Sequence, residues 1–164
     1  MLLELYGRIP PLADAAVGAA SPAQRTAAPG PGSNTIAWLV WHATRVQDHH
    51  VAELRGDDQV WAGGGWAQRF SLEPDPQNTG YGHGPDEVRR VVPSRPEDLT
   101  EYLGAVQART VAYLATLSEG DLDEVVDRRW DPPVTRGVRL VSVADDALQH
   151  LGQAAYLRGL LARG

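Results

Sequence analysis

Apolar residues recur at three- and four-residue steps in four stretches of the chain, and this spacing predicts amphipathic helices. The first stretch is interrupted at Pro10-Pro11, which should stop or kink a helix because proline lacks an N–H donor and restricts the preceding residue. The second stretch follows Thr35, an N-cap residue, and ends near Gly56, a C-cap residue. The four stretches cover about 2–20, 36–55, 97–117 and 140–163.

The segments between these stretches have the composition of loops. Residues 21–33 are rich in Pro, Gly and Ala and predict a loop, and residues 56–84 form a long glycine-rich excursion with interspersed aromatic residues. A short helix should begin at Pro85. No stretch alternates as a strand would, so we expect none. The pattern predicts one all-α domain over 1–164, a four-helix bundle with a long elaborated loop between its second and third main helices.

Composition narrows the range of functions. Hydrophobic residues make up 43% of the chain and charged residues 22%, so a packed core is expected. The net charge of -6 disfavours nucleic acid as a partner, since such domains normally present a basic surface. Charges interrupt every long apolar run and no basic segment opens the N-terminus, so we expect neither a membrane span nor a signal peptide, and a cytoplasmic location.

Two residue types are missing from the sequence. All 15 basic residues are Arg, so Schiff-base chemistry and a phosphate-loop lysine are excluded. There is no Cys, which excludes disulfides, thiolate zinc sites and a cysteine nucleophile. Any sulfur chemistry would therefore have to use the thiol of a ligand.

Asp146 and His150 are four residues apart on the last predicted helix, so their side chains should be neighbours on one face. Such a pair can bind a metal ion, and it can equally be a simple surface pair. His42, beside the apolar stripe of the second helix, is the candidate third ligand. Two His and one carboxylate leave coordination positions open, as in catalytic zinc sites. We therefore expect a reactive divalent-metal site, with zinc first and nickel, iron or manganese as alternatives.

Other polar residues near these positions have less specific patterns. His49 and Glu53 follow His42 on the same helix face, so they are candidates for a general base or for support behind the metal ligands. One of His49 and His50 is expected to be a core or rim residue. His83, at the end of the glycine-rich excursion, is expected to be a solvated loop histidine.

Over essentially its whole length, and most specifically in the two segments that carry the candidate ligands, the chain resembles the DinB/YfiT-like superfamily, particularly its actinobacterial branch similar to the N-terminal domain of mycothiol-dependent maleylpyruvate isomerase. The most specific parts are residues 35–48, TIAWLVWHATRVQD, and 145–153, DDALQHLGQ. The resemblance implies a four-helix bundle, often dimeric, with His42, Asp146 and His150 as metal ligands. Asp146 stands where relatives commonly carry His or Glu. Characterised relatives use low-molecular-weight thiols as cofactor or co-substrate.

These features together predict a metal-dependent transferase or isomerase, acting as a homodimer on a small-molecule thiol such as mycothiol and an electrophilic substrate. Two alternatives stay open. One is a metal-dependent hydrolase that activates water at the same site, with His49 or Glu53 as general base. The other is a non-enzymatic stress or binding bundle with a vestigial site.

Overall fold

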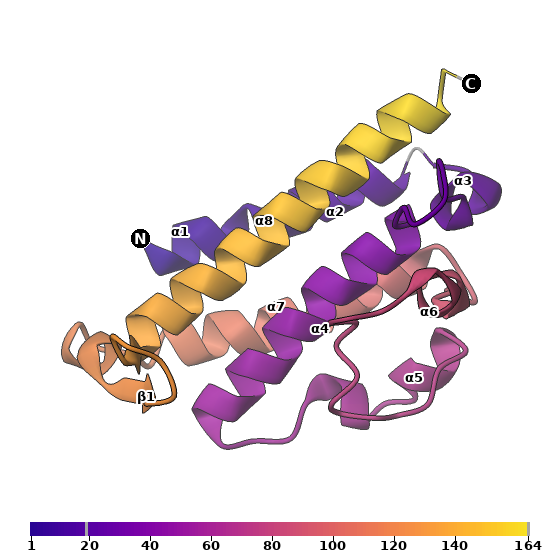
Figure 1. Cartoon of the computed structure of the whole chain (residues 1–164). Helices are drawn as coiled ribbons and strands as arrows, with labels where there is room; N and C mark the ends of the chain where they lie inside the picture. The colour runs from indigo at the N-terminus through magenta and orange to yellow at the C-terminus, as the bar shows by residue number, and fades with distance from the viewer. Residues whose placement is uncertain (19, 164) are drawn as a thin grey trace.

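Four long helical segments pack side by side, and the longest two run alongside each other (Figure 1). The structure, a computed structural model, describes residues 1–18 and 20–163. The bundle consists of α1 (Leu2–Gly7) continued by α2 (Ile9–Gly18), then α4 (Ile36–Arg55), α7 (Glu97–Leu114) and α8 (Arg136–Leu161). Both α2 and α4 pack against α7 and α8. The predicted all-α four-helix architecture is confirmed.

The ends of α4 and α8, which carry the candidate ligands, are set by local sequence. The Thr35 side chain accepts a hydrogen bond from the backbone of Trp38, and Thr135 does the same at the start of α8. At its other end α4 stops at Gly56, whose φ of 69° suits glycine. The two helices therefore begin and end at fixed positions, and their extensive mutual packing fixes how their faces meet.

The long excursion between α4 and α7 contains short helical turns and lies beside α4 (Figure 1). Its elements are η1 (Val60–Ala62), α5 (Trp66–Arg69) and α6 (Pro85–Arg90). Trp61, Phe70, Val88 and Val91 bury their side chains in the same hydrophobic core as the bundle. The excursion is thus packed onto the bundle rather than extended into solvent.

Two sequence-based expectations about the connections are wrong. A small antiparallel hairpin, β1 (Val125–Asp127) with β2 (Val134–Thr135), follows the turn η2 (Gly120–Asp123) where we expected no strand. Its strands of 3 and 2 residues are too short for alternation to be visible in the sequence. Within the predicted loop 21–33, a short helix α3 (Pro22–Thr26) forms because Ser21 and Gln24 cap it reciprocally.

A helix that spans a bilayer must be long and predominantly apolar, and this requirement applies to every helix of the described residues. None of them is both long enough and apolar enough to cross a membrane.

Candidate metal centre

The packing of α4 against α8 brings together the three residues predicted as metal ligands. His42, Asp146 and His150 each offer one ligand atom, and these atoms lie within 4.8 Å of one another. The ring centroids of the two histidines are 4.7 Å apart. Residues from distant parts of the sequence thus converge in the geometry that a single divalent ion would need.

The backbone of the excursion fixes the ring of His42. Its Nδ1 lies 2.6 Å from the carbonyl oxygen of Thr79. Because a carbonyl oxygen only accepts hydrogen bonds, Nδ1 must carry the hydrogen, which leaves the Nε2 lone pair free. Metal-binding histidines commonly use this arrangement, in which a second partner holds the ring and sets its tautomer.

The ring of His150 is held in the same way, by a hydrogen bond from Nδ1 to a backbone carbonyl oxygen. Its Nδ1 lies 2.9 Å from the backbone carbonyl of Asp146, so Nε2 is again the free nitrogen. The carboxylate of Asp146 adds an observation that favours a cation: Oδ2 is buried and has no hydrogen-bond partner among the described residues. A buried, unpaired carboxylate oxygen is costly, and a divalent ion would supply its missing partner. The three donors therefore fit a metal ion.

Close packing leaves His42 little freedom to rotate. The ring of Trp38 stacks on it, with centroids 4.5 Å apart and planes 11° apart. Gly80, at φ +92°, passes so close that a Cβ there would lie 2.9 Å from His42 Nδ1 and 2.9 Å from the ring of Trp41. Only glycine combines this backbone conformation with this approach.

The surroundings also keep His42 in the form that can ligate. Burial lowers the pKa of His42, because the imidazolium is poorly solvated there; nearby His150 and His83 act in the same direction, while Thr79 and Asp146 oppose them. Neutral imidazole is the metal-binding form. The site thus presents His42 unprotonated near neutral pH.

A cavity of about 460 Å³ opens beside two of the three predicted ligands, His42 and Asp146. Its walls come from α4, α8 and the excursion and are formed by His42, Val46, His49, His50, Gln77, Thr79, Tyr81 and Asp146. Thr79 and Tyr81 belong to the excursion, so this segment forms one wall of the cavity. There is room for a small organic molecule next to the ligand atoms.

A second group of potential metal ligands lies two to three turns beyond His42 on α4. His49, His50 and Glu53 also bring their potential ligand atoms within 4.8 Å of one another. His50 Nδ1 is 3.4 Å from Glu53, whose side chain is more than half exposed. His49 Nδ1 is 3.0 Å from the amide nitrogen of Gln59. The structure therefore places His49 in the wall of the cavity, whereas Glu53 is not among the lining residues. Among the described residues, neither makes a hydrogen bond to a predicted ligand.

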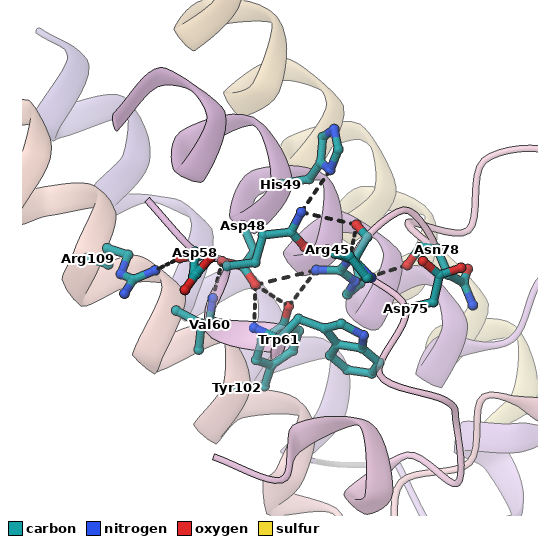
Figure 2. A network of polar contacts seen from close by, with 12 residues as sticks. Arg45, Asp48, His49, Asp58, Val60, Trp61, Asp75, Asn78, Tyr102 and Arg109 are labelled. Carbon is teal, nitrogen blue, oxygen red and sulfur yellow. Dashed lines mark hydrogen bonds and ion pairs between the residues drawn. The ribbon is translucent and has the colours of Figure 1, made fainter. Parts of the chain in front are cut away.

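A buried ionic network anchors the excursion to α4 just beyond His42 (Figure 2). Asp48 accepts hydrogen bonds from the backbone N–H groups of Val60 and Trp61, at 2.9 and 2.8 Å, and from the hydroxyl of Tyr102 at 2.8 Å. Arg45, 3.4 Å from Asp48, donates to the Tyr102 hydroxyl and to the carbonyl oxygens of two excursion residues, Pro76 and Asn78. Burial raises the pKa of Tyr102 well above its ordinary value.

Comparison with known proteins gives a consistent picture. A sequence model of the DinB superfamily matches residues 7–154. The chain belongs to the DinB superfamily. The crystal structure of a conserved protein from Enterococcus faecalis is similar to it, with 34% sequence identity, coverage of 99% of this chain and 96% of the other, and a TM-score of 0.91. A search of curated proteins finds no match.

Members of the DinB superfamily often bind metal ions, which agrees with the donor set found here. His83, however, was expected to be solvated and is instead half-buried beside the centre. Its Nδ1 accepts a hydrogen bond from Trp38 Nε1, its Nε2 contacts Asn78, and its ring stacks on Trp41. Burial lowers the pKa of His83.

Two contributors to this DinB-type centre were not recognised from the sequence. The Thr79 carbonyl is a backbone group, so no residue type signals it. Trp38 has a detectable signal, because it precedes His42 by four residues and therefore shares its helix face.

Proposed function

We propose that this protein is a metal-dependent enzyme that uses a low-molecular-weight thiol, of the mycothiol type, in transferase or isomerase chemistry. The supporting observation is the convergence of His42, Asp146 and His150, with a buried carboxylate oxygen that lacks a partner, beside an open cavity. Three protein donors leave coordination positions for a ligand, as in catalytic rather than structural zinc sites.

In this proposal the chain's own residues bind and orient. His42, Asp146 and His150 would hold a divalent ion, zinc first and nickel, iron or manganese as alternatives. Such an ion supplies Lewis acidity, which lowers the pKa of a thiol that binds to it. Thr79 and the Asp146 carbonyl keep the histidine rings oriented. Because the sequence contains no Cys, the sulfur nucleophile would come from the ligand.

Metal analysis tests the foundation of this proposal. Wild-type protein, prepared without chelator or affinity tag and then exposed to zinc, should contain about one metal ion per chain, and His150→Ala should lose it. His50→Ala is a matched control on the neighbouring cluster and should keep it. Wild-type protein without stoichiometric metal would contradict the proposed metal centre and favour the non-enzymatic alternative.

Thiol chemistry tests the activity itself. Zinc-loaded protein should bind N-acetyl-L-cysteine or mycothiol and should accelerate its conjugation to a model electrophile such as monobromobimane. Absence of both binding and conjugation would overturn the proposal. Hydrolytic turnover of ester or amide substrates without added thiol would instead identify the alternative, a hydrolase.

We also propose that the chain acts as a homodimer, which the resemblance to DinB/YfiT-like proteins implies. Light scattering in solution should give twice the 17.7 kDa mass of one chain. A monomer at all accessible concentrations would refute this part without affecting the metal centre.

A further inference from the structure

The hydrogen-bond partner of His49 differs in kind from those of the two ligand histidines. Gln59 Nε2 lies 3.0 Å from His49 Nδ1 and also 3.1 Å from the carbonyl oxygen of Pro76. The Pro76 oxygen can only accept, so the Gln59 atom facing it must be the amide nitrogen. The opposite amide orientation would bring two acceptor oxygens within 3.1 Å of each other.

The amide group of Gln59 therefore determines the tautomer of His49. An NH₂ group donates one hydrogen to Pro76 and its other hydrogen to His49, so Nδ1 of His49 must be the acceptor. A neutral His49 then carries its hydrogen on Nε2. The orientation leaves Gln59 Oε1 buried without a partner among the described residues, so the two donated hydrogen bonds are what hold this side chain in place.

The ring of His49 lines two cavities. It lines the site cavity together with His42 and Asp146, and it lines a second cavity of about 490 Å³ together with Gln59, which does not line the site cavity. The ring edge opposite Gln59 is therefore the one that can face the site cavity. Figure 2 shows the ring of His49 with one nitrogen bonded toward the network and the other directed away from it. No second hydrogen-bond partner of His49 occurs in residues 1–18 or 20–163, so its Nε2–H is available to a ligand.

We propose that Gln59 fixes His49 in the Nε2–H tautomer, so that His49 is a hydrogen-bond donor to an oxygen atom of the ligand in the site cavity. A carbonyl or carboxylate oxygen of the thiol or of the electrophile has this chemistry. In this tautomer His49 presents no lone pair to the cavity, so it serves neither as a general base nor as a ligand of a second metal ion. Gln59 is the positioning residue. For the identity of its ligand, this inference rests on the proposed function.

The tautomer can be measured without metal or ligand. Long-range ¹H–¹⁵N correlation spectra of histidine-labelled protein, at a pH where the ring is neutral, should show the His49 hydrogen on Nε2. Gln59→Glu replaces the donor by an acceptor and should move the hydrogen to Nδ1, and Gln59→Met, which neither donates nor accepts strongly, should give a mixture. Gln77→Glu places the same charge on another cavity residue that makes no bond to His49, and it should leave the tautomer unchanged.

Hydrogen on Nδ1 in the wild type, or equal spectra for wild type and Gln59→Glu, would overturn the inference. The second part of the inference, that His49 donates a hydrogen bond to the ligand, is tested by a separate measurement of ligand affinity. His49→Ala should retain full zinc content and bind N-acetyl-L-cysteine about fivefold more weakly, the effect of one lost hydrogen bond. Unchanged affinity would refute the donor role. If wild type binds no thiol, the proposed function fails, while the tautomer measurement still decides this inference.

Discussion

The group that faces Nδ1 of a histidine determines which ring nitrogen carries the hydrogen, and this group differs among the histidines of the site. His42 and His150 face backbone carbonyl oxygens, which free Nε2 for a metal ion, whereas His49 faces an amide NH₂ group. The residue type is the same in each case. The nitrogen at which a neutral histidine offers a lone pair therefore depends on the group that its other nitrogen faces.

His50 should make the stability of the metal-free protein depend on pH. Burial lowers its pKa, and the charges of Arg139 and His49 add to this effect, while Glu53 opposes it. The unfolded chain therefore takes up this proton at higher pH than the folded protein, and the free energy of unfolding should fall as the pH drops below about 6.5. Urea unfolding at about pH 5.5 and about pH 7.5 measures the change. His50→Gln should reduce it, and an unaltered dependence would contradict the assignment.

Asp48 should be among the most sensitive positions for stability. Its carboxylate is 1% exposed and accepts from two backbone N–H groups, Tyr102 and Arg45. Asp48→Ala leaves the Arg45 charge buried without a counterion, so the free energy of unfolding should fall by about 3–5 kcal/mol.

Tyr102→Phe is the control for Asp48, because it removes one hydroxyl and no charge. It should cost about 1–2 kcal/mol in urea-induced unfolding. Equal losses for the two variants would show that the ion pair itself contributes little.

The sequence predicts a helix and its ends most accurately where the spacing of apolar residues and the capping residues agree. The spacing of apolar residues predicted α4 and α8, and Thr35 and Gly56 marked the ends of α4 correctly. The ligand positions followed from the same helical geometry, because Asp146 and His150 are one turn apart. Short elements escaped detection, since a hairpin with strands of 3 and 2 residues contains no full alternation.

The excursion could not be placed from the sequence for a physical reason. Several of its contacts with α4 use backbone groups, among them the carbonyls of Pro76, Asn78 and Thr79, which every residue type possesses. The aromatic residues interspersed in this segment give no indication that it orients His42. The solvated state expected for His83 was wrong for the same reason, as its partners depend on how the excursion folds back.

The close approach of the excursion to His42 can be tested at Gly80. Both Gly80 and Gly82 have positive φ, +92° and +77°, so alanine at either should cost about 1–2 kcal/mol in stability. Only at Gly80 would the new Cβ meet His42 and Trp41, whereas at Gly82 nothing lies within 4 Å. Gly80→Ala should therefore be less stable and bind zinc more weakly than Gly82→Ala, as measured by calorimetry. Equal zinc affinity in the two variants would show that the close packing of Gly80 against His42 does not affect metal binding.

For the whole molecule, the centre joins the two helices with the most extensive mutual packing. A metal ion bound only by the folded chain stabilises it by mass action, by about 2.7 kcal/mol when free metal is 100 times the dissociation constant. Wild type should therefore unfold at higher temperature with added zinc. His150→Ala should show no such shift in differential scanning calorimetry, and a shift of equal size would place the ion elsewhere.

The contact between Thr79 and His42 has a consequence for exchange of the bound ion. When residues 71–83 detach from α4, His42 loses the carbonyl that holds its ring, so metal affinity must fall in the detached state. By reciprocity the ion must oppose detachment by the same free energy. Zinc should therefore slow protease cleavage within 71–83, and His150→Ala should abolish this protection. The segment that contributes no metal ligand would then control how readily the ion leaves.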